Sequence, residues 1–468
     1  MSPSTDPADP FVTAHELARA IRRRRISAAE AVSETLERIA RCNGLLNAYL
    51  AVFDAPARRA AARADRLLRS RGAGGEAGPL HGVPVSVKDL IVTTEGPTTA
   101  GSRIFGDGLT AAKDAEVVRW LRRAGAIVIG KTNLHEVALG VTTVNEHFGP
   151  ARNPWDARRM SGGSSGGSAA ALAAGLGPLS VGTDTRGSIR IPAACCGVTG
   201  LKPTRGLVSL EGVVPLSPTL DHAGPMARTA LDCALMLGVM AGGSDPLRYL
   251  RSAQRRASGL RIGVSEFHLR DLSREVQRVI EAALREVSRE GGRLRSVRVA
   301  ELDDAQAASV RITAPEAFAW HERHIRERPE AYGPRVLGRL AAGREWSAVD
   351  YLRAQESRTR VTGAFAETFR AVDLLVGAAL PVPAPAIDET TVRAGGREEG
   401  IVDAFTRLNS PQNMAGVPAL VMPAGFTPSG LPVGLQVIGP AGQDGRVLAF
   451  GAAWQRATDW HLRRPPMD

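Results

Sequence analysis

A stretch rich in glycine and small hydroxyl residues holds the side chains of this chain that are best suited to chemistry. It covers residues 161–203 and reads SGGSSGGSAAALAAGLGPLSVGTDTRGSIRIPAACCGVTGLKP. Two short loops, at 162–168 and 183–188, flank an Ala-rich segment that we expect to form a helix and a strand. Because glycine permits close backbone approach and unusual dihedral angles, such loops indicate a preorganised set of backbone N–H donors. We interpret the stretch as a site rather than a linker.

Ser188 is the candidate nucleophile in this stretch. It follows an expected strand at 179–182 across a tight turn at 183–187, which lets its hydroxyl stand exposed while the preceding N–H groups converge. A serine hydroxyl is a weak nucleophile at its own pKa and needs a base. None of the nine histidines lies in the stretch. The sequence therefore favours a Ser–Lys arrangement, which requires a lysine that burial makes neutral.

Lys88 is the lysine that fits this requirement. The chain has only four lysines, at positions 88, 113, 131 and 202. Residues 83–90, VPVSVKDL, alternate in a way that predicts a short strand with Lys88 on the face opposite Val87. The alternative interpretation is a surface lysine on an edge strand, and the strand pattern alone does not separate the two.

Two familiar motifs match the sequence without their structural context. Residues 125–132, GAIVIGKT, fit the P-loop pattern, but the four intervening residues form a hydrophobic strand pattern where that loop needs exposed backbone. Residues 162–166, GGSSG, fit the nucleophile elbow, which requires a preceding strand, whereas RNPWDARRM is a polar loop. Neither motif supports a nucleotide-binding or elbow-type hydrolase site.

Seven segments in order along the chain resemble the amidase signature hydrolases, a family that uses a Ser–cis-Ser–Lys triad. They are residues 82–89, 130–133, 162–168, 182–185, 187–190, 200–203 and 430–436. The resemblance implies that Lys88 is the base and that Ser188 is the acylated nucleophile. It also implies that Ser164 follows a cis peptide bond and relays the proton between them.

The same resemblance implies a set of supporting residues. Backbone N–H groups near the nucleophile would stabilise the tetrahedral oxyanion, and outer side chains would support the site. The oxyanion donors are Thr185, Arg186, Gly187 and Ser188, and the outer supports are Ser165, Asp184 and Arg190.

Two positions depart from the pattern of the family. Arg186 stands where the family usually has glycine. If its side chain points into the pocket, it offers a cation to carbonyl-rich or anionic substrates; if it points away, only its backbone N–H matters. Both alternatives stay open at this point. Ile191 stands where the glutaminase subunit of tRNA-dependent amidotransferases generally has glutamine.

The rest of the chain alternates helix and strand patterns, which predicts one large α/β domain with a mixed central sheet flanked by helices on both faces. Capping residues Thr13 and Ser27 predict two N-terminal helices, and a third is expected over 55–71. Later helices are expected at 115–124, 230–241, 275–290, 307–328, 347–371 and 445–457, and later strands at 126–129, 260–264, 296–299, 373–377, 419–423 and 431–438.

Within this single domain, residues 1–468, we expect four regions. They are a helical N-terminal segment at 10–75, a catalytic core at 76–245, a more variable helical region at 300–372, and a C-terminal sheet and helix at 373–460. The helical region has the weakest pattern and is the candidate lid or substrate-facing part.

Composition narrows the class of protein. With 468 residues, 44% of them hydrophobic, the chain has ample material for a large core. Its net charge of +11 is spread along the chain rather than collected in one stripe, so we expect no nucleic-acid partner. No apolar run is long enough to span a bilayer, and we expect a cytoplasmic protein without a membrane partner. Cys42, Cys195, Cys196 and Cys233 show no metal-ligand spacing and are expected to be reduced and buried.

These observations predict a serine hydrolase that cleaves C–N bonds of small amides, carbamates (urethanes) or ureido compounds through an acyl-enzyme. We expect no cofactor and no metal, and a homodimer is compatible with the sequence. One alternative is a glutaminase-type subunit of a tRNA-dependent amidotransferase, which needs partner chains and which Ile191 argues against. Another is an inactive binding protein on this scaffold, which only Arg186 suggests.

Overall fold

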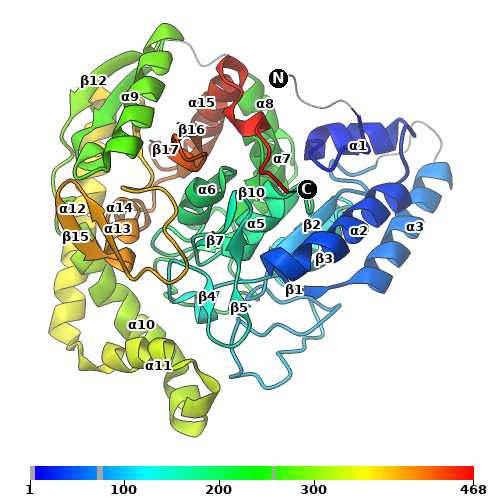
Figure 1. The fold of residues 1–468 in the computed structure, drawn as a ribbon, viewed down its shortest axis with the longest axis horizontal. Coiled ribbons are helices and arrows are strands. Elements are labelled where there is room, and N and C mark those ends of the chain that lie inside the picture. Colours follow the sequence, from blue (N-terminus) through cyan, green and yellow to red (C-terminus); the bar gives the residue numbers. More distant parts are fainter. Residues whose placement is uncertain (1–5, 71–76, 256–258, 468) are drawn as a thin grey trace.

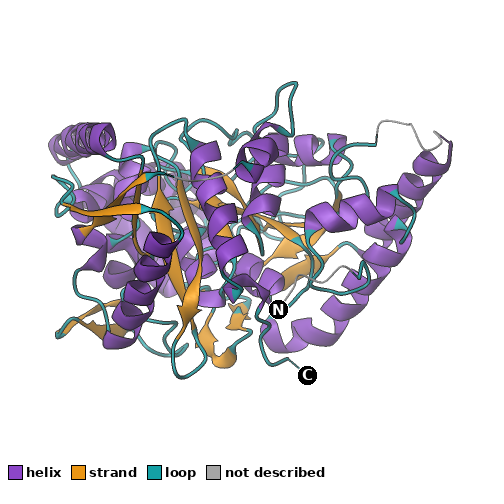
Figure 2. Cartoon of the chain, turned by 90° about the horizontal axis from the view of Figure 1, so that it is seen from above, coloured by secondary structure: helices purple, strands orange, loops and turns teal. Residues whose placement is uncertain are grey.

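An eleven-stranded mixed sheet forms the frame of the protein. The computed structural model describes residues 6–70, 77–255 and 259–467. The strands lie in the order β1-β3-β2-β8-β10-β9-β16-β17-β13-β11-β12, and helices cover both faces (Figures 1 and 2). The predicted single α/β domain with a mixed central sheet is confirmed.

The strands of this sheet are short, and most of them are buried on both faces. Their bounds, in chain order, are β1 Tyr49–Val52, β2 Pro84–Lys88, β3 Ile127–Thr132, β8 Leu179–Asp184, β9 Thr199–Lys202, β10 His222–Ala227, β11 Arg261–Ser265, β12 Arg293–Val297, β13 Leu374–Ala378, β16 Ala419–Phe426 and β17 Pro432–Ile438. Hairpins outside the sheet pair β4 (Val144–Asn145) with β5 (Gly149–Pro150), β6 (Arg152–Asn153) with β7 (Asp156–Met160), and β14 (Thr391–Ala394) with β15 (Arg397–Gly400).

The helices surround the sheet in three groups. The N-terminal ones are α1 Ala14–Arg22, α2 Ala28–Leu46 and α3 Asp54–Ser70. The central ones are α4 Glu116–Arg123, α5 Gly166–Ala173, α6 Arg190–Cys196, α7 Ala230–Met240, α8 Arg248–Gln254 and α9 Arg274–Arg289. The later ones are α10 Ala305–Glu327, α11 Pro334–Ala341, α12 Ala348–Ala371, α13 Ile401–Arg407, α14 Ser410–Ala415 and α15 Asp444–Ala457. None of these helices is long and apolar enough to cross a membrane.

The N-terminal caps form as their sequences predict. The Thr13 hydroxyl accepts a hydrogen bond from the N–H of Glu16 at the start of α1. Ser27 and Glu30 form a reciprocal capping box at the start of α2. Helix α3 ends at Ser70, and the loop expected from residue 71 begins in residues 71–76, outside the described residues.

Several local predictions were wrong for reasons of packing. The alternative of Lys88 on an edge strand fails, because β2 pairs with β3 on one side and with β8 on the other. The expected loop at 162–168 ends early, since α5 begins at Gly166. Cys42 is only half-buried, whereas the other three cysteines are buried, and all four are free thiols. Strand β10 was missed because its sequence, HAGPMA, contains glycine and proline, yet it is fully buried between β8 and β9.

The helical region contains a helix that the sequence pattern did not predict. Helices α10 and α12 pack together at the edge of the molecule, and the unpredicted α11 projects between them and the β4–β5 hairpin (Figure 1). Strand β12 begins three residues earlier than expected, at Arg293. The division of the chain at 75, 245, 300 and 372 stays a prediction.

Helix α5 packs closely against the sheet at one glycine, Gly167. The N–H of Gly167 donates to the carbonyl of Asn133, directly after β3. A Cβ at Gly167 would lie 2.5 Å from the carbonyl oxygen of Ala48 and from the backbone N and O of Asn133. Because these contacts are backbone atoms, they cannot rotate away. Glycine at this position therefore sets the distance between α5 and the sheet.

We predict that Gly167→Ala lowers the free energy of unfolding by about 1 to 3 kcal/mol, the usual cost of overpacking a close contact. Denaturant unfolding measures it. Gly44→Ala is the matched control, because Gly44 lies in α2 with nothing within 4 Å of an added Cβ. The free energy of unfolding of that control should rise by about 0.5 to 1 kcal/mol, because alanine is favoured over glycine inside a helix. Equal stability of Gly167→Ala and the wild type would contradict the inference that Gly167 sets the distance between α5 and the sheet.

Candidate active site

Two side chains from separate elements contact Lys88. Lys88 ends β2 and is fully buried. Its Nζ donates to Oγ of Ser164, at 2.6 Å, and to Oγ1 of Thr183, at 2.8 Å. Ser164 lies in the loop before α5, and Thr183 lies near the end of β8. Parallel pairing of β2 with β8 brings the ends of both strands to the same edge.

Burial makes this lysine unusual. Removal from water lowers the pKa of Lys88 to about 7, although the carboxylates of Asp184 and Asp221 oppose the shift. A large fraction of the amine is therefore neutral near pH 7 and can accept a proton. With Nζ neutral, the Ser164 hydroxyl can act as the donor in their hydrogen bond. The pair can then pass a proton in either direction.

The loop that carries Ser164 is fixed by backbone contacts. The peptide bond between Gly163 and Ser164 is cis, as the resemblance implies. The carbonyl oxygen of Ser164 accepts hydrogen bonds from the N–H of His135, at 3.1 Å, and from Oγ1 of Thr143, at 3.3 Å. Ser164 is fully buried.

Ser165 joins this loop to the turn that carries Ser188. Its N–H donates to the carbonyl of Ser188, at 3.1 Å. Its hydroxyl donates to the carbonyl of Thr183 and accepts from the N–H of Thr183, at 3.1 and 3.3 Å. Ser188 is 6% exposed. The two loops expected from the sequence are therefore neighbours in space.

The turn at 183–188 is shaped by Asp184. Its carboxylate accepts from the N–H of Gly187, at 2.7 Å, and from the N–H of Ile189, at 3.2 Å. Gly187 has a φ of 119°, a value that side chains rarely permit. The expected oxyanion donor Gly187 is thus engaged by Asp184. The N–H groups of Thr185, Arg186 and Ser188 have no hydrogen-bond partner among the described residues, so they remain the candidate donors.

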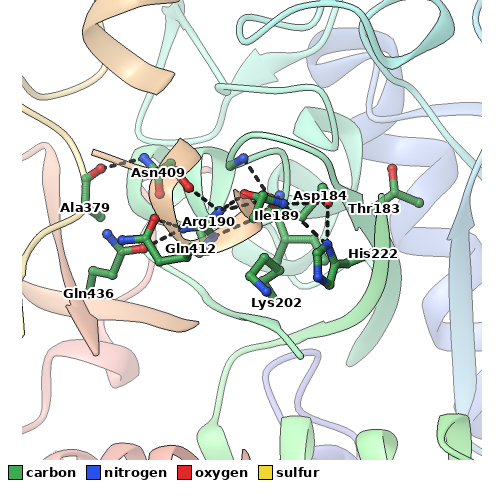
Figure 3. A network of polar contacts seen from close by, with 12 residues as sticks. Thr183, Asp184, Ile189, Arg190, Lys202, His222, Ala379, Asn409, Gln412 and Gln436 are labelled. Carbon is green, nitrogen blue, oxygen red and sulfur yellow. Dashed lines mark hydrogen bonds and ion pairs between the residues drawn. The ribbon is translucent and has the colours of Figure 1, made fainter. Parts of the chain in front are cut away.

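Arg190 holds Asp184 in place from the opposite side. Its Nε and Nη2 each lie 3.0 Å from an Asp184 oxygen, and both side chains are fully buried (Figure 3). Burial alone would raise the pKa of Asp184, but Arg190 and then Lys202 lower it, so the carboxyl is ionised. Four further acceptors or donors complete the network, namely Asn409, Gln412, Asn413 and Gln436.

Sequence reasoning missed part of this site. Thr183 was expected only as a turn residue, and its contact with Lys88 becomes visible only once β2 is known to pair with β8. Asn413 and Gln412 lie in α14, in a Pro-containing segment without a helix pattern. Gln436 falls in a segment that carried the family resemblance, which was the one available signal.

A cavity of about 360 Å³ adjoins the Ser164 loop through His135, although no candidate site residue lines it. Residues of the segment 135–146, of α11 and of the start of α13 line it, and one of them, His135, donates its N–H to Ser164. A larger hollow of about 820 Å³ lies between α9 and α15, but no candidate site residue lines it. The described residues include no group of three His, Cys, Asp or Glu placed to hold a metal ion.

Comparison with known proteins identifies the class. A family model described as Amidase matches residues 30–448. The chain belongs to the amidase family, and the predicted membership of the amidase signature enzymes is confirmed.

Several relatives are similar over nearly the whole chain. A subunit of the glutamyl-tRNA(Gln) amidotransferase of Cupriavidus taiwanensis is 39% identical, covering 98% of this chain and 99% of the relative. A solved structure described with the words "an unexpected vestigial protein complex reveals the evolutionary origins of an s-triazine catabolic enzyme" is 34% identical. It has a TM-score of 0.91 and covers 97% of this chain and 100% of its own. A crystal structure of an amidase is 37% identical, with a TM-score of 0.88 and coverage of 95% and 99%.

The lysine pKa can be measured without a substrate. The chain has only four lysines, so ¹³C-lysine NMR gives a simple spectrum. We predict that the Lys88 side chain titrates with a midpoint of about 7, protonated below and neutral above, because burial disfavours the charged form. Lys88→Met assigns the signal by removing it. A midpoint near the ordinary value of 10.5 would contradict the interpretation.

Proposed function

We propose that this protein hydrolyses a C–N bond of a small amide by acyl transfer through Ser188. The observation that carries the proposal is the 2.6 Å contact between the buried Nζ of Lys88 and Oγ of Ser164, next to the turn that bears Ser188. Membership of the amidase family supports a hydrolase acting on C–N bonds. The roles of the individual residues belong to this proposal.

The proposed reaction has two halves. In the first, Oγ of Ser188 attacks the substrate carbonyl carbon, and its proton passes through Ser164 to neutral Lys88. The resulting oxyanion is stabilised by backbone N–H groups of the turn, Thr185, Arg186 and Ser188. When the tetrahedral intermediate collapses, the C–N bond breaks, and the proton returns through Ser164 to the departing nitrogen. An ester between Ser188 and the acyl group remains.

In the second half, water replaces Ser188 on the acyl carbon. Lys88 and Ser164 take a proton from the attacking water and return it to Oγ of Ser188 as the ester bond breaks. The acid product leaves and the free enzyme is restored. Carbamates, including urethanes, and ureido compounds are further substrates in this proposal, because each presents an acyl carbon bonded to nitrogen.

The comparisons favour a glutaminase-type role over a self-sufficient hydrolase. Relatives that are 39% and 37% identical are named as subunits of a glutamyl-tRNA(Gln) amidotransferase, so partner chains are part of this second candidate. The chemistry at Ser188 would be the same, with glutamine as the amide. Against it stands Ile191, which is fully buried and packs on Gly187 of the turn. A cytoplasmic location stays a prediction in both cases.

We predict that Ser188→Ala lowers turnover at least about 1,000-fold with little change in stability, because only one small hydroxyl is lost. A fluorophosphonate probe should label the wild type at Ser188, as mass spectrometry of the labelled peptide shows. Ser288→Ala, an exposed serine on α9, is the control and should retain labelling and turnover. Labelling that persists in Ser188→Ala would contradict the assignment of Ser188 as the nucleophile. A wild type that the probe does not label would favour the alternative of an inactive binding protein.

The self-sufficient and glutaminase candidates are separated by measuring ammonia release. For a self-sufficient hydrolase, the purified chain alone should release ammonia from a panel of small amides and ureido compounds. For a glutaminase-type subunit, we expect negligible release from glutamine by the chain alone, and a rise when partner chains and glutamyl-tRNA(Gln) are added. Turnover that is unaffected by the partners would dismiss the amidotransferase candidate.

A further inference from the structure

We propose that the guanidinium of Arg186 binds a carboxylate of the substrate, so that the preferred amides are anionic. This inference rests on the proposed function and narrows its substrate class. It is carried by a buried, unsatisfied guanidinium nitrogen and by the place of Arg186 in the turn of Ser188. Arg186 and Ser188 are separated by one residue, so both belong to the turn that presents the nucleophile.

The guanidinium of Arg186 has an N–H donor that no acceptor pairs with among the described residues. Nη1 of Arg186 is buried and has no hydrogen-bond partner among the described residues. Buried donors are nearly always satisfied, and one left unpaired costs free energy that a ligand can recover. The planar fork of arginine matches the two oxygens of a carboxylate. A bound carboxylate would therefore supply the missing acceptor.

The turn does not need this side chain for its own geometry. On one side of Arg186, Oγ1 of Thr185 donates to Asp221, at 2.6 Å. On the other side, the N–H of Gly187 donates to Asp184, at 2.7 Å. Both neighbours are thus held by carboxylates that are already engaged with the turn itself. Of the two alternatives left by the sequence, a structural role has no hydrogen bond among the described residues to support it.

The charges that act on Arg186 come from α11 and α13, two helices that also contribute to the cavity lining, although Arg186 itself does not line the cavity. Burial lowers the pKa of Arg186 to about 10, with Asp403 opposing this shift and Arg339 adding to it. Arg339 lines the cavity from α11, and Asp403 follows the lining residues Ile401 and Val402 in α13. With a pKa of about 10, the guanidinium carries its charge at neutral pH.

Most of the acids on the cavity wall are already engaged. They are Glu136, Glu146, Asp388 and Glu389. Glu136 accepts hydrogen bonds from Ser102 and from the N–H of Gly333, Glu146 lies 3.5 Å from Arg335, and Glu389 accepts from the N–H of Ala386. The wall therefore carries four acids against two arginines, Arg335 and Arg339, so the attraction for a carboxylate would come from Arg186 itself and not from the wall.

The test compares an anionic amide with a neutral one of the same shape. Succinamate carries a carboxylate where butyramide carries a methyl group. We expect the ratio of kcat/KM for succinamate to that for butyramide to fall about 10- to 100-fold in Arg186→Gln, the usual effect of losing a charge-assisted pair. Arg186→Lys should keep an intermediate ratio, because the charge remains and the fork is lost. Arg344→Gln removes an exposed arginine that lies beside Glu345 and should leave the ratio unchanged.

A binding measurement accompanies the kinetics. Succinate should slow labelling of Ser188 by a fluorophosphonate in the wild type, and at least about tenfold more succinate should be needed in Arg186→Gln. Equal losses for succinamate and butyramide, together with unchanged protection by succinate, would overturn the inference. If the wild type is still labelled at Ser188 and hydrolyses butyramide, that result leaves the proposed function intact. A wild type that neither reacts with the probe nor hydrolyses either amide would overturn both.

Discussion

The structure depends on one carboxylate that is kept ionised without water. Asp184 is fully buried, and it accepts hydrogen bonds from the turn at Gly187 and Ile189 while it pairs with Arg190. Loss of either charged partner would leave an uncompensated buried charge, which typically costs about 3 to 5 kcal/mol. Strand β8, helices α6 and α14 and strand β17 all contribute to this pair. The turn beside Ser188 can therefore change shape only if the centre of the molecule changes with it.

The sequence predicted those site residues that lie in recognisable local patterns, and it missed those whose contacts depend on distant segments. Lys88, Ser164 and Ser188 sit in segments whose local patterns are informative, a β-branched strand and two glycine-rich loops, and the structure brings these segments together. Thr183 contacts Lys88 only because β2 and β8 pair in a particular register, which no local pattern encodes. Asn413 donates to Asp184, which lies 229 residues away in the sequence, and the residues adjacent to Asn413 in the sequence do not predict that contact.

The alternation of helix and strand patterns along the chain predicted the fold class. Individual strands were missed where burial stabilises residues of low strand propensity. Strand β10 keeps Gly224 and Pro225 inside a sheet because both faces are covered and β8 pairs along its whole length. The direction of the Arg186 side chain was open from the sequence, since a turn residue can face either way. The engagement of the Gly187 N–H by Asp184 was also hidden, because a resemblance supplies positions and not hydrogen-bond partners.

The burial of the lysines has a consequence for chemical handling of the protein. Lys88, Lys131 and Lys202 are fully buried, whereas the side chain of Lys113, in the loop between β2 and α4, is 75% exposed. Among the described residues, amine-directed reagents too bulky to enter the interior would thus find a single lysine, Lys113. A crosslinker or dye attached through lysine chemistry would sit at one defined place. Surface immobilisation by that route would orient every molecule in nearly the same way.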